Sequence, residues 1–169
     1  MIEAVIFDLY ETLITESAIK PTRASSLAAV LGLEEDAYRV EWRKRRPGIV
    51  RGEMSFADAL AQITSCLVGR VDRAAIHGIC QQRIREKAAA YALIDGGVTG
   101  LVTALTDRGI GLAVISNGFE EDIVGWPQCS LARWFQCTAF SYSERVAKPD
   151  PGGGYSLGNH ILHEDQSSF

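Results

Sequence analysis

Two short apolar runs, far apart in the sequence, constrain the fold more than any other feature. Residues 4–7 read Ala-Val-Ile-Phe, residues 112–115 read Leu-Ala-Val-Ile, and a polar residue follows each run. A continuous apolar run of this length is typical of a strand buried on both faces of a parallel sheet. Residues 137–140, Cys-Thr-Ala-Phe, are a weaker third candidate. The sequence therefore predicts an α/β fold with a doubly wound parallel sheet.

The stretch between the first two runs predicts a mostly helical insertion. Apolar residues recur there at helical spacing in four segments, which would pack as a small bundle. We expect one helix to end at Gly32, a second to run from Glu34 to Arg46 and stop at Pro47, and two more to begin after the N-capping residues Ser55 and Asp72.

The domain boundaries follow from this pattern. Residues 1–14 and 93–151 are predicted to form the α/β core, and residues 15–92 the helical insertion. Residues 152–169 open with three glycines and show no sustained helix or strand period, so we expect a disordered tail.

Composition narrows the function classes. The chain has 169 residues, a net charge of −4 and 47% hydrophobic residues, as in an ordinary globular protein, and nothing suggests binding to nucleic acid or to an anionic membrane. The N-terminus lacks the pattern of a signal peptide and no apolar stretch reaches the length of a membrane span, so a cytoplasmic location is expected. The four cysteines include no C-x-x-C pair and are expected to be reduced thiols.

Three polar residues follow the predicted strands. Asp8 comes after the first, Ser116 after the second, and Lys148 shortly after the third. Ligands of an open parallel sheet bind beyond the carboxyl ends of its strands, so these side chains are expected to meet there. Such a set suits nucleophilic catalysis: the carboxylate attacks, the lysine keeps it ionised and stabilises developing negative charge, and the hydroxyl holds the transferred or leaving group.

Three segments carry a resemblance to a known family. Residues 7–13 (Phe-Asp-Leu-Tyr-Glu-Thr-Leu), 115–118 (Ile-Ser-Asn-Gly) and 147–151 (Ala-Lys-Pro-Asp-Pro) resemble, in order, the first three motifs of the haloacid dehalogenase superfamily. The resemblance implies a Rossmann-like core with a helical cap inserted after the first strand. It also implies that Asp8 forms an aspartyl-enzyme intermediate that water hydrolyses, while residues 15–92 close over the site.

The resemblance leaves two substrate classes open, 2-haloacids and phosphate esters. Phosphatases of the superfamily carry a general acid and base Asp where this chain has Tyr10, whereas the dehalogenases have Tyr there, because halide needs no proton to leave. The Trp42-Arg43 pair also resembles the dehalogenases, but Glu11 stands where both classes have Gly. The substrate-binding residues implied are Tyr10, Thr12, Asn117 and Arg43. A phosphatase would hold Mg²⁺ at Asp8, and a dehalogenase would need no cofactor.

The family's fourth motif is not recognised after residue 151. We therefore expect a core that is incomplete at the C-terminus, with residues 4–7 as an exposed sheet edge that favours a homodimer or aggregation. The alternative to an active hydrolase is a catalytically inactive truncated or frameshifted product. The only partner otherwise expected is a small-molecule substrate.

Overall fold

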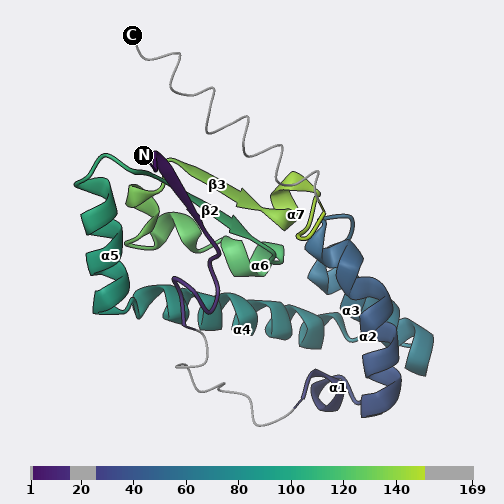
Figure 1. Ribbon diagram of the computed structural model, residues 1–169. Helices are drawn as coiled ribbons and strands as arrows, with labels where there is room; N and C mark the ends of the chain where they lie inside the picture. Colours follow the sequence, from purple (N-terminus) through teal and green to yellow (C-terminus); the bar gives the residue numbers. More distant parts are fainter. Residues whose placement is uncertain (1, 16–25, 151–169) are drawn as a thin grey trace.

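The computed structural model describes residues 2–15 and 26–150, which form a parallel sheet joined to a helical segment (Figure 1). The sheet consists of β1 (Ala4–Phe7), β2 (Gly111–Ser116) and β3 (Cys137–Phe140), in the order β1-β2-β3. Both neighbouring pairs are parallel. The predicted α/β fold with a parallel sheet is confirmed.

Burial of β1 differs from the prediction. It was expected to be buried on both faces, but the side chain of Ile6 is 51% exposed, while Val5 and Phe7 are half-buried against the core. The reason is position: among the described residues β1 lies at the sheet edge and has a partner on one side only. The central strand β2, with a neighbour on each side, is the strand that is mostly buried.

One face of the sheet carries the first apolar cluster. Strand residues such as Leu112 and Val114 pack there against Tyr91, Val102 and Trp126. The helices on this side are α5 (Gly96–Thr106), α6 (Glu120–Ile123) and the 3-10 turns η2 (Trp126–Gln128) and η3 (Ala132–Trp134). The short helix α7 (Ser141–Glu144) follows β3 directly. The parallel pairing of β1 with β2, in which Phe7 lies opposite Val114, places the carboxyl ends of the two strands side by side.

The helical segment consists of α1 (Leu27–Val30), α2 (Glu35–Val50), α3 (Phe56–Val68) and the first part of α4 (Arg73–Ala92). The predicted N-caps are confirmed, because the side chains of Ser55 and Asp72 accept hydrogen bonds from main-chain N–H groups of the first turns of α3 and α4. Gly32 has a φ of +67°, the left-handed conformation typical of a helix C-terminus.

The predicted end of the second helix is wrong. It was placed at Pro47, but α2 continues through this proline to Val50. Proline lacks the N–H that would bond to the preceding turn, so one hydrogen bond is lost. The extra turn buries Ile49 and Val50 in the second apolar cluster, and this burial favours continuation of the helix.

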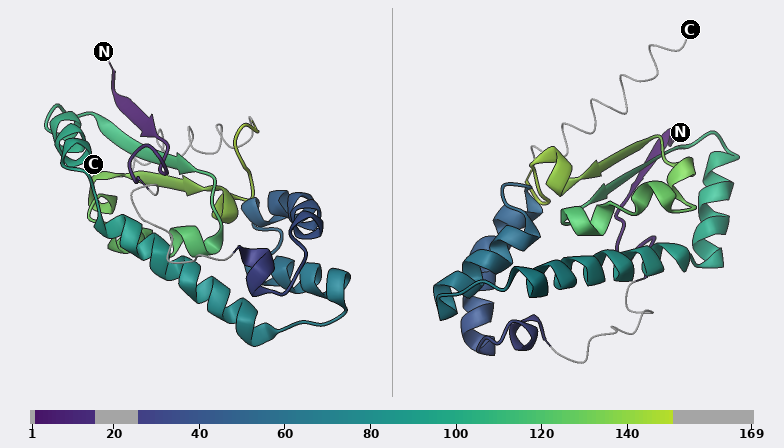
Figure 2. Two further views of the ribbon diagram at one scale, coloured as in Figure 1. Left: turned by 90° about the horizontal axis from the view of Figure 1, so that it is seen from below. Right: turned by 180° about the vertical axis from the view of Figure 1, so that it is seen from behind.

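Helix α4 joins the two parts of the molecule. Its N-terminal half contributes Ile76, Ile79 and Cys80 to the cluster of the helical segment, and its end contributes Ala90 and Tyr91 to the cluster under the sheet. Figure 2 shows this long helix running beneath the sheet and on into the helical segment. The proposed boundary at residue 92 stays a prediction, and the predicted tail, residues 152–169, lies outside the described residues. Within residues 2–15 and 26–150, no single helix is long and apolar enough to cross a membrane; α4 and α5 reach that length and composition only as a pair bent by 66°.

Candidate active site

Asp8 and Lys148 meet at the carboxyl ends of β1 and β2, as the sequence pattern predicted. The Lys148 ammonium lies 2.8 Å from Asp8 Oδ1 and donates a hydrogen bond to the main-chain carbonyl of Ile115 at 3.0 Å. The two side chains are 50% and 40% exposed, respectively. The carboxylate is therefore accessible to a ligand from solvent.

The two oxygens of Asp8 differ in their surroundings. Oδ1 forms an ion pair with the Lys148 ammonium and accepts a hydrogen bond from the main-chain N–H of Leu9, each at 2.8 Å. Within the part of the chain that the structure describes, no hydrogen bond or ion pair reaches Oδ2. The ammonium and the amide thus both contact Oδ1, and among the described residues Oδ2 has no such partner.

Asn117 and Ser116 take different positions. The Asn117 side chain pairs with the main chain of Lys148: Nδ2 donates to its carbonyl at 3.0 Å, and Oδ1 accepts from its N–H at 2.9 Å. Ser116 is buried at the end of β2, and none of the hydrogen bonds among the described residues involves its hydroxyl. The structure therefore brings Asn117 to Lys148, whereas no hydrogen bond among the described residues links the Ser116 hydroxyl to Asp8 or Lys148.

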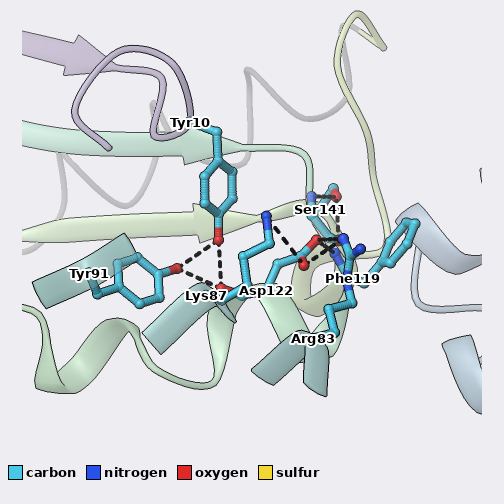
Figure 3. A network of polar contacts seen from close by, with 8 residues as sticks. Tyr10, Arg83, Lys87, Tyr91, Phe119, Asp122 and Ser141 are labelled. Carbon is cyan, nitrogen blue, oxygen red and sulfur yellow. Dashed lines mark hydrogen bonds and ion pairs between the residues drawn. The ribbon is translucent and has the colours of Figure 1, made fainter. Parts of the chain in front are cut away.

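The Tyr10 hydroxyl bonds residues of α6 and α4. Its hydroxyl donates to the main-chain carbonyl of Asp122 at 2.6 Å and lies 2.8 Å from the hydroxyl of Tyr91 (Figure 3). The Lys87 ammonium lies 4.0 Å from the centre of the Tyr10 ring. The phenol is therefore engaged in a contact between the first loop and α6.

The other two predicted substrate-binding residues are exposed. Thr12 lies in the turn after Asp8, which is closed by a hydrogen bond from the Leu13 N–H to the Leu9 carbonyl. Arg43 lies on the outer face of α2, and no contact among the described residues links it to Asp8. Glu11 has a φ of +55°, a conformation that costs a residue with a Cβ more than it costs glycine, which gives a physical reason for the glycine that the family has there.

The sequence pattern missed a buried charged residue, Asp122 on α6. Its carboxylate contacts the Arg83 guanidinium at 2.6 and 2.8 Å, accepts from the Phe119 N–H at 2.9 Å and lies 3.6 Å from the Lys87 ammonium. Arg83, Lys87 and Tyr91 are spaced at intervals of four on α4, so one face of this helix meets Asp122 (Figure 3). The recurrence of polar side chains at every fourth position of α4 is the sequence pattern that could have indicated a buried charged partner.

The helical segment contacts the core at two further places. Phe119, which follows the second motif, packs against Trp42 and Phe56, and the Arg83 guanidinium lies 4.6 Å from the centre of its ring. Gly52, between α2 and α3, lies against the main chain of Tyr142 on α7. The helical segment is thus held against both segments that follow β2 and β3.

Burial perturbs two titratable groups at this junction. Desolvation raises the pKa of Glu121 on α6, despite the opposing effect of its own main-chain hydrogen bond and of Arg83. Burial and then the Glu121 carboxylate raise the pKa of Cys80 to about 11, so this thiol stays protonated at neutral pH.

The residues near Asp8 supply oxygen ligands only sparingly. Within the described residues no group of three or more His, Cys, Asp or Glu side chains could hold a metal ion. Mg²⁺, however, retains several waters and is often bound through one or two carboxylates together with a substrate phosphate. The Asp8 carboxylate fits that limited role.

Comparisons with known proteins agree with the motifs. The family model of haloacid dehalogenase-like hydrolases matches residues 2–155. A 2-haloacid dehalogenase from Pseudomonas syringae is similar in fold, with a TM-score of 0.64 and 18% identity over 96% of this chain and 74% of that chain. The HAD family enzyme bt-2542 from Bacteroides thetaiotaomicron matches with a TM-score of 0.62 and 16% identity, over 95% of this chain and 79% of that chain.

A second structure of that enzyme, in complex with magnesium and inorganic phosphate, has a TM-score of 0.57 and 15% identity, over 96% of this chain and 80% of that chain. No curated protein matches the sequence. At these identities the similar structures show the fold alone.

Proposed function

Because the chain belongs to the haloacid dehalogenase-like hydrolase family, we propose that it hydrolyses a small acidic substrate through an aspartyl-enzyme intermediate on Asp8. The observation that carries the proposal is the contact of Asp8 Oδ1 with Lys148 at 2.8 Å, which leaves Oδ2 for attack. The helical segment serves as the cap that closes over the bound substrate.

With a 2-haloacid, Oδ2 of Asp8 attacks the carbon that bears the halogen. A carbon–oxygen bond forms, the carbon–halogen bond breaks, and halide leaves with the bonding electron pair. Water then attacks the carbonyl carbon of the ester, which restores the Asp8 carboxylate and releases a 2-hydroxy acid and a proton. The Lys148 ammonium stabilises the negative charge on the Asp8 carboxyl group during the second step.

With a phosphate ester, Oδ2 attacks phosphorus, the bond from phosphorus to the ester oxygen breaks, and that oxygen needs a proton to leave as the alcohol. Water then cleaves the aspartyl phosphate into the Asp8 carboxylate and inorganic phosphate. Mg²⁺, bound to Asp8 and the substrate phosphate, would supply charge neutralisation when present. Tyr10 occupies the position of the phosphatases' proton donor, but its hydroxyl is bonded to the Asp122 carbonyl and Tyr91. This contact favours the dehalogenase form of the proposal, in which no proton donor is needed.

The test compares two substrates. Purified protein is incubated with 2-chloropropionate, and separately with p-nitrophenyl phosphate and Mg²⁺. Turnover that is abolished in Asp8→Asn and retained in the control Glu3→Gln, an exposed carboxylate before β1, supports the proposal. Activity on the haloacid that persists in excess EDTA identifies the dehalogenase form, and loss in EDTA with recovery in Mg²⁺ identifies the phosphatase form.

An Asp8→Asn variant that keeps half of the activity would remove Asp8 from the mechanism. Absence of turnover on a broad set of halogenated acids and phosphate esters would favour the catalytically inactive alternative.

A further inference from the structure

We propose that Asn117 is a positioning residue that acts on the reaction through Lys148, rather than a residue that binds substrate. The inference rests on the proposed role of Asp8. It assigns to Asn117 the task of placing the lysine ammonium against the carboxylate.

The hydrogen bonds of the Asn117 side chain go to the main chain of a single residue. Its amide N–H and its amide oxygen each bond the main chain of Lys148, at 3.0 and 2.9 Å. A primary amide presents one donor and one acceptor side by side, and here they match the C=O and N–H of one residue. The pair ties together two segments that are 31 residues apart in sequence.

The hydrogen bonds from Asn117 matter for Lys148 because this residue lies outside regular secondary structure. Helix α7 ends at Glu144, and Lys148 lies beyond it with its side chain 40% exposed. A lysine side chain loses up to about 2 kcal/mol of conformational entropy when it is held in one arrangement. Fixing its main chain leaves fewer rotatable bonds to order.

Asn117, in contrast, is held by the sheet. It directly follows Ser116, whose position is set by the pairing of β2 with β3 opposite Phe140. The next residue, Gly118, donates its N–H to the buried hydroxyl of Ser141 at 3.1 Å. A continuous path therefore runs from the rigid strand β2 through the Asn117 amide to the Lys148 main chain, and from its ammonium to Asp8 Oδ1.

This arrangement predicts a specific kinetic pattern. Loss of the amide lets Lys148 sample other positions while Asp8 and the substrate-binding surface remain, so the chemical steps slow and substrate affinity changes little. In Asn117→Ala, kcat is expected to fall about 10- to 100-fold with KM within about twofold. A residue that touched the substrate in the ground state would instead raise KM.

A double-mutant cycle tests whether Asn117 acts through the lysine. In a Lys148→Met background, Asn117→Ala is expected to cause no further loss of kcat, because the group that it positions is gone. The same fold-change in both backgrounds, or a KM effect at constant kcat, would overturn the inference. Asn117→Asp, which keeps an acceptor for the Lys148 N–H and loses the donor, is the second variant if the alanine protein does not fold, and it is expected to retain more kcat than alanine.

Amide hydrogen exchange provides a readout that is independent of activity. The Lys148 N–H is expected to exchange at least about tenfold faster in Asn117→Ala than in the wild type, since its acceptor is lost. If neither the wild type nor any variant hydrolyses a substrate, the proposed function fails. Faster exchange of the Lys148 N–H in Asn117→Ala would still support the hydrogen bonds from Asn117 to the Lys148 main chain. Unchanged exchange at Lys148 would contradict these hydrogen bonds themselves.

Discussion

The Arg83 guanidinium on α4 lies 2.6 Å from one oxygen of the Asp122 carboxylate on α6 and donates to the other at 2.8 Å. The two side chains are 30% and 6% exposed, so the pair is largely removed from water. Helix α4 is shared by the helical segment and the core, and α6 begins three residues after Asn117. The ion pair therefore joins α4 to the segment whose Asn117 side chain bonds the main chain of Lys148. Loss of this ion pair is expected to lower the free energy of unfolding more than it lowers the catalytic rate.

We expect Arg83→Met to lower the free energy of unfolding by about 3 kcal/mol, because the buried Asp122 carboxylate keeps the Phe119 N–H but loses its close cation and retains only the more distant Lys87 ammonium as a counter-charge. Arg39→Met is the matched control, since Arg39 pairs with Glu35 on the surface of α2 and should cost less than about 0.5 kcal/mol. Urea unfolding measures both. Equal losses in the two variants would show that the Arg83 pair contributes no more than a surface pair.

Gly52 should tolerate no side chain. Its φ is +66°, and a Cβ would lie 2.2 Å from the main-chain oxygen of Tyr142. Gly52→Ala is expected to cost about 2–4 kcal/mol from backbone strain and displacement of α7 together. Gly69→Ala isolates the strain, since Gly69 has a φ of +69° with no atom within 4 Å of its Cβ position, and should cost about 1–2 kcal/mol. Unfolding by urea that ranks the two variants in the opposite order would contradict the close contact.

Glu121 makes stability depend on pH. Burial raises its pKa in the folded protein above the usual value of 4.5, so the folded state binds the proton more tightly than the unfolded state. Its contribution is fully present below pH 4.5 and is lost as pH rises through the raised folded pKa. Because glutamine stays neutral, Glu121→Gln should have a higher melting temperature than the wild type at pH 7. The difference between the two melting temperatures should become smaller as the pH is lowered towards 4. A melting temperature that falls at pH 7 would show that the ionised carboxylate is stabilising.

We propose that the exposed side of β1 mediates self-association through strand pairing between two copies. Ile2 and Ile6 are both largely exposed along this edge, and unpaired main-chain groups of an edge strand favour such pairing. Ile6→Lys should shift the protein to monomer in size-exclusion chromatography and reduce ANS fluorescence, because a lysine on the edge opposes pairing. Val124→Lys, an equally exposed apolar residue on the α6 side, serves as control. A wild-type protein that elutes as a sharp monomer peak without dye binding would refute the proposal.

Local patterns in the sequence were sufficient for the strands, the helix starts and the central pair of the site. The apolar runs identified β1, β2 and β3, and Ser55 and Asp72 marked the starts of α3 and α4 because a cap depends on residues three positions away. Asp8 and Lys148 were predicted to meet because parallel strands place their carboxyl ends at one edge. These features depend on short-range chemistry or on the geometry of any parallel sheet.

Tertiary contacts alone decided the rest. Pro47 stays inside α2 because the turn after it buries Ile49, and β1 is half-exposed because the described residues provide it with one neighbouring strand, so neither outcome follows from local propensity. Likewise, the side chains of Asn117 and Tyr10 pair with the main chain of Lys148 and Asp122, which lie 31 and 112 residues away. A hydrogen bond is directional and acts over about 3 Å, so which distant partner a polar side chain takes is determined only when packing has brought the two segments together.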